Sequence, residues 1–200
     1  KKACSISAQA HIRAMKSVKP VMFEYELEAE YVHEFMKNGA RDCAYTPIVG
    51  SGNNSCILHY NQNDRKMENG DLVLVDAGCE YQGYASDITR TFPVNGKFSP
   101  EQKLIYEIVL EAHNNCIEML KPGVSWMQVH KKSIETITSG LIDIDLLKGS
   151  LEENIELEKY SKFYMHKVGH WLGLDVHDVG GYGSEGNWRL MEQGMVTTIE

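Results

Sequence analysis

A strongly apolar run that ends in a carboxylate, residues 72–76, is the feature that most restricts the fold of this chain. Such a run is typical of a buried strand, and Gly78 begins a turn signal just after it. Residues 81–92 have the composition of a returning strand, so the sequence predicts a hairpin. Asp76 and Asp87 fall on its two arms and can meet across one face. Because an unpaired buried carboxylate is costly, they could form a two-carboxylate metal cradle. A turn-capping Asp and an edge-strand Asp would fit the spacing equally well.

Helices are predicted on both sides of this hairpin. They cover residues 1–16, 24–38, 99–121, 125–139 and a further stretch from residue 150. The third is the best marked, because Ser99, Pro100 and Gln102 combine an N-cap, a helix-opening proline and a capping box. Its apolar stripe is expected to face the core and consists of Leu104, Ile105, Ile108, Val109, Ala112 and Cys116. Residues 45–59 are strand-like around a turn signal, and short strands and glycine-rich loops follow residue 164. This order of elements predicts an α+β fold.

The bulk composition excludes some functional classes. The chain of 200 residues has a formal net charge of −8 and no basic stripe, which argues against nucleic-acid binding. It has no apolar run that could span a bilayer and no secretory signal segment. Its five scattered cysteines fit reduced thiols better than a disulfide framework. We therefore expect a cytoplasmic protein with no membrane partner; a mitochondrial location, with a transit peptide upstream of residue 1, is the alternative.

Three histidines within twelve residues, His166, His170 and His177, are the second candidate site. A metalloprotease zinc helix is disfavoured, because residue 167 is Lys and glycines at 169 and 173 make a helix poor here. A single histidine would be read as a satisfied core residue, whereas three together favour a site. His59 and Glu200 say little when taken alone.

Four blocks of this sequence closely resemble the Xaa-Pro aminopeptidase (aminopeptidase P) family. They are residues 48–60, 75–81, 86–98 and 169–178, and the resemblance covers essentially the whole chain. It implies the pita-bread fold of the M24 metallopeptidases, a curved antiparallel sheet with outer helices. It also implies that residues 1–200 form one catalytic metallopeptidase domain. By that comparison we expect the domain to be truncated at its C-terminal end, without the family's last bridging Glu and its N-terminal domain.

The resemblance also implies roles for matched residues. Asp76 would chelate one metal, Asp87 would bridge two, and His170 would bind the second metal with Glu200. Glu200 would also move a proton, and the site would be lined by His59, His166 and His177. Two divalent ions are implied, Mn²⁺ first, with Co²⁺ or Zn²⁺ accepted; carboxylate-rich ligands suit Mn²⁺.

The implied substrates are peptides with proline in second position, and the full-length protein is expected to be a homo-oligomer. The 200-residue chain itself, with four of five expected ligands, is expected to be inactive. Prolidase is the nearest alternative and shares most motifs; methionine aminopeptidase fits residues 87–98 poorly. A non-catalytic binding module is the alternative from another class. Against it stands the joint presence of Asp76, Asp87, His170 and Glu200.

Overall fold

The computed structural model describes residues 1–200 as two compact units. The first unit comprises Lys1–Ser99 and Leu172–Asp178, and the second comprises Pro100–Trp171 and Val179–Glu200. None of the helices is both long enough and apolar enough to cross a bilayer. Helices and antiparallel strands are both present, which confirms the predicted α+β class.

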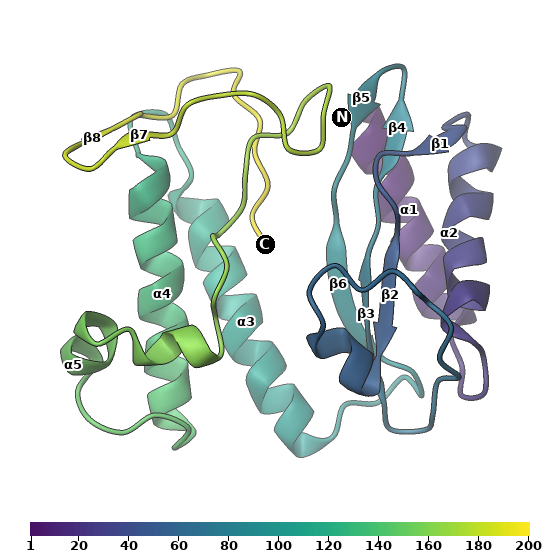
Figure 1. The fold of residues 1–200 in the computed structure, drawn as a ribbon, viewed down its shortest axis with the longest axis horizontal. Helices are drawn as coiled ribbons and strands as arrows, with labels where there is room; N and C mark the ends of the chain where they lie inside the picture. The colour runs from purple at the N-terminus through teal and green to yellow at the C-terminus, as the bar shows by residue number, and fades with distance from the viewer. The chain divides into compact units, whose positions relative to one another are not determined.

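The first unit contains two helices and two small antiparallel sheets (Figure 1). The helices are α1 (Lys2–Ser17) and α2 (Glu24–Lys37). One sheet has the order β2-β3-β6, formed by β2 (Ile48–Ser51), β3 (Leu72–Asp76) and β6 (Thr89–Pro93). The other has the order β1-β4-β5, formed by β1 (Asp42–Cys43), β4 (Cys79–Tyr81) and β5 (Tyr84–Ala85). A 3₁₀ helix, η1 (Gly52–Cys56), follows β2.

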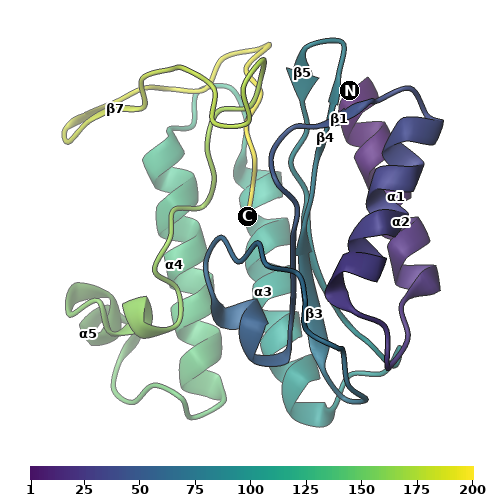
Figure 2. The same cartoon turned by 45° about the vertical axis from the view of Figure 1, so that its right-hand side comes forward.

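The core of this unit lies between the helix pair and β3. In β3, Val73 and Val75 are fully buried and alternate with half-buried residues, as expected for a strand with one face on a core. Leu27 and Tyr31 of α2 are buried in the same apolar cluster. Both views show α1 and α2 side by side against the sheet (Figures 1 and 2).

The predicted hairpin is only partly correct. Strand β3 pairs antiparallel with β6, and Asp76 lies opposite Thr89. However, residues 81–92 do not form one strand, because positive φ angles at Gln82 and Gly83 turn the chain sharply. The turn joins β4 to β5, which pair with each other. The excursion carries Asp87 back to the sheet just before β6 begins.

The second unit is mainly helical. It contains α3 (Pro100–Met119), α4 (Trp126–Asp143), α5 (Leu151–Glu156) and η2 (Lys159–Lys162). Two short strands, β7 (Gly183–Ser184) and β8 (Asn187–Trp188), pair in its last third. A capping box of Ser125 and Gln128 begins α4, and Ser150 caps α5, at the position the sequence predicts.

The sequence predicts that the apolar stripe of α3 faces the core along the whole helix, but only part of the stripe is buried. Ala112 and Cys116 are buried. Leu104, Ile105 and Val109 are 51%, 41% and 51% exposed, respectively. The prediction was correct for the C-terminal half of the helix, which packs with Trp126 and Val129. Near the start of the helix, the periodicity correctly groups the apolar side chains on one face, but no other segment of the chain covers that face fully.

Candidate metal centre

Two carboxylates of the first unit converge on one hydroxyl group. Asp76 is the last residue of β3, and Asp87 lies two residues before β6. The Tyr45 hydroxyl donates to Oδ1 of Asp76 and lies 2.9 Å from Oδ1 of Asp87. Both carboxylates are only partly buried. The expected meeting of these two side chains on one face therefore occurs, and Tyr45 joins them.

Sequence reasoning missed Tyr45. Burial, followed by the charges of Asp76 and Asp87, raises the pKa of its hydroxyl above the ordinary value. The tyrosine therefore stays protonated and acts as a donor to the two carboxylates. A lone tyrosine in strand-like sequence is ordinary, so only its pairing with two distant acids identifies it.

The backbone around Asp87 is anchored on α1. The Ser7 and Ser86 hydroxyls lie 2.8 Å apart, and Nε2 of His11 lies 2.9 Å from the Ile88 carbonyl oxygen. Burial lowers the pKa of His11 to about 4, so the ring is neutral at neutral pH. A Cβ at Gly78 would lie 1.7 Å from the Ser86 carbonyl oxygen, so this position requires glycine. Both neighbours of Asp87 are thus held in place.

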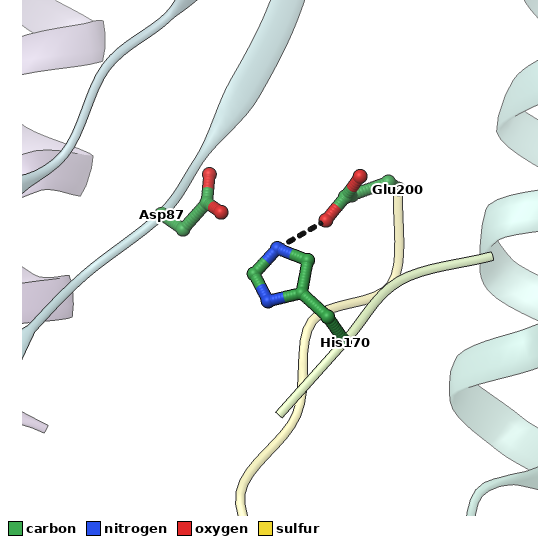
Figure 3. A group of neighbouring side chains, drawn as sticks. All are labelled: Asp87, His170 and Glu200. Carbon is green, nitrogen blue, oxygen red and sulfur yellow. Dashed lines mark ion pairs between the residues drawn. The ribbon is translucent and has the colours of Figure 1, made fainter. Parts of the chain in front are cut away.

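In the second unit, an imidazole and a carboxylate point at each other. Nε2 of His170 lies 2.8 Å from Oε1 of Glu200 (Figure 3). The other ring nitrogen, Nδ1, lies 2.9 Å from the Trp171 carbonyl oxygen, which can only accept a hydrogen bond. The Trp171 carbonyl therefore keeps a proton on Nδ1, and Nε2, which faces the Glu200 carboxylate, is the ring nitrogen that a cation placed between the two groups would take as ligand.

Two short segments hold this pair together. The Thr198 hydroxyl donates to Glu200 at 2.7 Å and accepts from the His170 amide at 3.0 Å. The Glu200 amide donates to the Val168 carbonyl at 2.9 Å, so the segments run as a ladder. A Cβ at Gly169 would lie 2.5 Å from the Thr198 carbonyl oxygen. The glycine that argued against a zinc helix thus allows this close approach.

An aromatic cluster supports the residue after His170. The rings of Trp171 and Tyr182 are stacked with centroids 5.4 Å apart, and Trp126 lies 5.7 Å from Tyr182. The Trp171 amide donates to the Tyr182 hydroxyl at 3.0 Å. This packing fixes the backbone whose carbonyl selects the His170 tautomer.

The other predicted site histidines are exposed and fall on different units. His59 and His177 belong to the first unit and His166 to the second. His59 has a positive φ of 55°, which is uncommon for a residue with a side chain. Nδ1 of His166 lies 2.8 Å from the Lys167 carbonyl, and its ring packs edge-on to Tyr164 at 5.0 Å.

Comparison with known proteins decides the family. The model of metallopeptidase family M24 matches residues 1–200. The chain belongs to this family. It is 54% identical over 195 residues to an Xaa-Pro aminopeptidase of Haemophilus influenzae and 52% identical over 200 residues to that of Escherichia coli. These matches cover 98% and 100% of this chain but 45% of each relative. The chain thus spans under half the length of these relatives.

Solved structures give the same picture. The aminopeptidase PepP of Pseudomonas aeruginosa matches with a TM-score of 0.97 at 54% identity, covering 99% of this chain and 45% of that one. A zinc-substituted Escherichia coli aminopeptidase P in complex with product matches with a TM-score of 0.96 at 52% identity, covering 98% of this chain and 44% of that one. The fold is therefore that of the aminopeptidase P structures.

The donor chemistry of each unit fits a divalent cation. Two carboxylates close enough to share one hydroxyl repel each other, and a cation between them offsets that repulsion. In the second unit, the Glu200 carboxylate oxygen and Nε2 of His170, both common metal ligands, face each other at 2.8 Å. Oxygen-rich ligands with one imidazole suit manganese, and also zinc.

Proposed function

We propose that this chain is the metal-binding part of an Xaa-Pro aminopeptidase, which hydrolyses the bond between an N-terminal residue and a following proline. Two observations support this: 54% identity to a protein named for that activity, and the pairing of Asp76 and Asp87 under Tyr45. The pairing carries the proposal, because two carboxylates held together suit divalent cations better than any other chemistry in this chain. In this proposal the two units together form one catalytic domain.

The proposed metal ligands are Asp76 and Asp87 in the first unit and His170 and Glu200 in the second. We propose two divalent ions, with Mn²⁺ first. When bound, such a pair activates a water molecule near neutral pH and polarises the attacked carbonyl. Tyr45 keeps the Asp76 and Asp87 carboxylates in position, and the Trp171 carbonyl holds His170 in the ligating tautomer.

In the same proposal, Glu200 takes a proton from the attacking water and passes it to the leaving nitrogen. Thr198 orients its carboxylate through the 2.7 Å hydrogen bond. In this proposal the imidazoles of His59, His166 and His177, all of them exposed residues, donate to the substrate and to the oxygen of the tetrahedral intermediate. Proline selectivity would come from the shape of the site walls, because the imide nitrogen of proline has no N–H that the site could recognise by a hydrogen bond.

The remaining parts of the proposal concern the setting of the protein. The five cysteines are free, which supports the reducing cytoplasm. We propose a homo-oligomer for the full-length protein, since the family resemblance implies one. We also propose that the 200-residue chain alone does not turn over substrate, because the resemblance implies one further bridging carboxylate.

The test uses the natural full-length protein and an Xaa-Pro-Yaa tripeptide in the presence of Mn²⁺. We expect release of the first residue by the full-length protein, loss of at least about 100-fold in Asp87→Ala, and no release by residues 1–200 alone. Cleavage of an Xaa-Pro dipeptide, without cleavage of the tripeptide, would replace this proposal with a prolidase. If neither peptide is cleaved and no metal binds, the protein is a binding module.

A further inference from the structure

A fully buried carboxylate outside the proposed metal centre accepts an unusual number of hydrogen bonds. Glu24, the first residue of α2, is 0% exposed. Its Oε1 accepts from the Ser51 amide at 2.7 Å, from the Ser51 hydroxyl at 2.7 Å and from the Asn54 side chain at 3.3 Å. Its Oε2 accepts from the Tyr60 hydroxyl at 2.7 Å and from the Arg65 amide at 3.0 Å. One side chain therefore satisfies five donors.

These donors lie on both sides of His59 in the chain. Ser51 and Asn54 precede it, and Tyr60 and Arg65 follow it. The loop between them begins with η1 and then passes through exposed residues to His59, whose backbone has a positive φ. One carboxylate on a helix thus closes the base of the loop that presents this histidine.

We propose that Glu24 is a positioning residue for His59: its buried carboxylate clamps residues 51–65, so that the imidazole is held in one place for the substrate. The inference rests on the proposed function, in which His59 faces the peptide. It adds a residue of α2 whose side-chain hydrogen bonds go to residues 51–65 and to none of the proposed metal ligands.

The buried carboxylate of Glu24 is better explained by the arrangement that it imposes on its donors than by a gain in the free energy of unfolding. A buried charge contributes little net stability and often can be replaced by well-packed apolar groups. A carboxylate with five aimed donors does specify one arrangement, because each donor has a direction as well as a distance. Arg65 adds to this order, since its guanidinium bonds the Ser51 hydroxyl at 2.8 Å and Asp71 at 2.5 Å.

The substitution Glu24→Gln separates the clamp from side-chain size. Each carboxylate oxygen receives one backbone N–H, from Ser51 on one side and Arg65 on the other. These backbone donors cannot reverse, whereas hydroxyl groups can turn to accept. A glutamine has only one oxygen, so its NH₂ group must face one of the two N–H groups. We therefore expect one end of the loop to be released while the volume of the side chain is kept.

Leu27→Ala is the matched control. Leu27 lies one turn further along α2, is 0% exposed and belongs to the apolar core, so its truncation leaves a cavity while the Glu24 carboxylate keeps its donors. If Glu24 only stabilised the fold, Glu24→Gln and Leu27→Ala would lose the same fraction of kcat for the same decrease in melting temperature.

The decisive measurement is a double-mutant cycle in the full-length protein, with kcat and KM measured on the tripeptide and Mn²⁺. We expect Glu24→Gln to lower kcat about 10- to 100-fold and Leu27→Ala to leave it within about twofold. If Glu24 acts through His59, adding Glu24→Gln to His59→Ala costs little further activity. Losses that multiply, or an unchanged kcat in Glu24→Gln, would overturn the proposal.

Hydrogen exchange tests the clamp independently of activity. In Glu24→Gln, amides of residues 52–60 should exchange at least about tenfold faster, while those of β3 keep their rates. Equal exchange of residues 52–60 in the variant and the unchanged protein overturns the clamp. If the unchanged protein cleaves no peptide, the proposed function fails, yet this measurement still decides whether Glu24 holds the loop.

Discussion

At the scale of single residues, the one hydroxyl hydrogen of Tyr45 is shared between the carboxylates of Asp76 and Asp87. Tyr45 has a single hydroxyl hydrogen, so it donates to Asp76 or to Asp87 at any moment. It restrains both side chains without neutralising either one, and it leaves their remaining oxygens for other partners. A cation-holding pair needs such a restraint, because without it the two like charges would move apart.

Replacement of Tyr45 tests this restraint. In the full-length protein, we expect Tyr45→Phe to weaken Mn²⁺ binding by about 10- to 100-fold, as loss of a group that orients metal ligands usually does. Isothermal titration calorimetry with Mn²⁺ measures the change. Tyr25→Phe is the control, because Tyr25 is 51% exposed and stacks on Phe23. Equal affinity in Tyr45→Phe and the unchanged protein would show that the hydroxyl does not restrain the ligands.

The sequence identifies the acidic residues of the proposed site more readily than the residues that hold the site in position. Asp76 is conspicuous because it ends an apolar run, where a carboxylate needs a reason to be present. Tyr45 and Glu24 are not conspicuous, since one sits in ordinary strand-like sequence and the other looks like a solvated residue at a helix start. Their roles arise from contacts across 31 and 27 residues, to Asp76 and Ser51 respectively, and no local pattern encodes them.

At the scale of elements, a neutral histidine joins two helices to the segment that carries Asp87. Nε2 of His11 in α1 donates to the Ile88 carbonyl, so Nδ1 is free to accept from the Tyr31 hydroxyl of α2 at 2.9 Å. A second proton on the ring would place N–H against the Tyr31 hydroxyl and put a charge into a buried site. Burial is accordingly the main cause that lowers the pKa of His11 to about 4.

This lowered pKa predicts a loss of stability in mild acid. Well above pH 6.5 His11 is neutral in both the folded and the unfolded state and contributes no pH dependence. As the pH falls from 6.5 to about 4, the unfolded chain takes up a proton that the folded chain excludes, so the free energy of unfolding decreases. The loss from His11 reaches at most about 3 kcal/mol and levels off below pH 4. His130 of the second unit, also desolvated, has its pKa lowered to about 4 and acts in the same direction.

Urea unfolding of the full-length protein between pH 7 and 4 measures this effect. We expect His11→Gln, which keeps a donor for the Ile88 carbonyl but does not titrate, to flatten the dependence of the free energy of unfolding on pH. The control is His33→Gln, since His33 is exposed. A pH dependence as steep in His11→Gln as in the unchanged protein would contradict the prediction.

The helices could be predicted wherever the sequence contains a capping residue at their first turn. The starts of α4 and α5 follow from Ser125 and Ser150, whose side chains accept from the third residue of each helix. Strands of two or three residues, such as β4 and β5, are too short to show periodicity, so the sequence predicts one strand over residues 81–92, where the structure has a turn, β5 and most of β6. The exposed part of α3 shows a further limit, because periodicity cannot say which other segment covers an apolar face.

At the scale of the whole molecule, the proposed ligands are divided between the two compact units. Asp76 and Asp87 come from the first, and His170 and Glu200 from the second. If one dinuclear centre takes all four, metal binding couples the two units, and its binding energy stabilises both. If instead each unit bound its own ion, loss of a ligand would affect only its own unit.

Hydrogen exchange of the full-length protein, with and without Mn²⁺, distinguishes these cases. We expect Mn²⁺ at about 100 times its dissociation constant to add roughly 2.7 kcal/mol of stability and to slow exchange at residues 72–87 and also at residues 197–200. In Asp87→Asn the slowing should disappear from both segments, because in the proposed function Asp87 binds the same ions as His170 and Glu200. In Glu80→Gln, which changes an exposed acid in β4, it should persist in both. Slowing that survives at residues 197–200 in Asp87→Asn would mean that the second unit binds its ion without the first, and that the four residues do not form a single site.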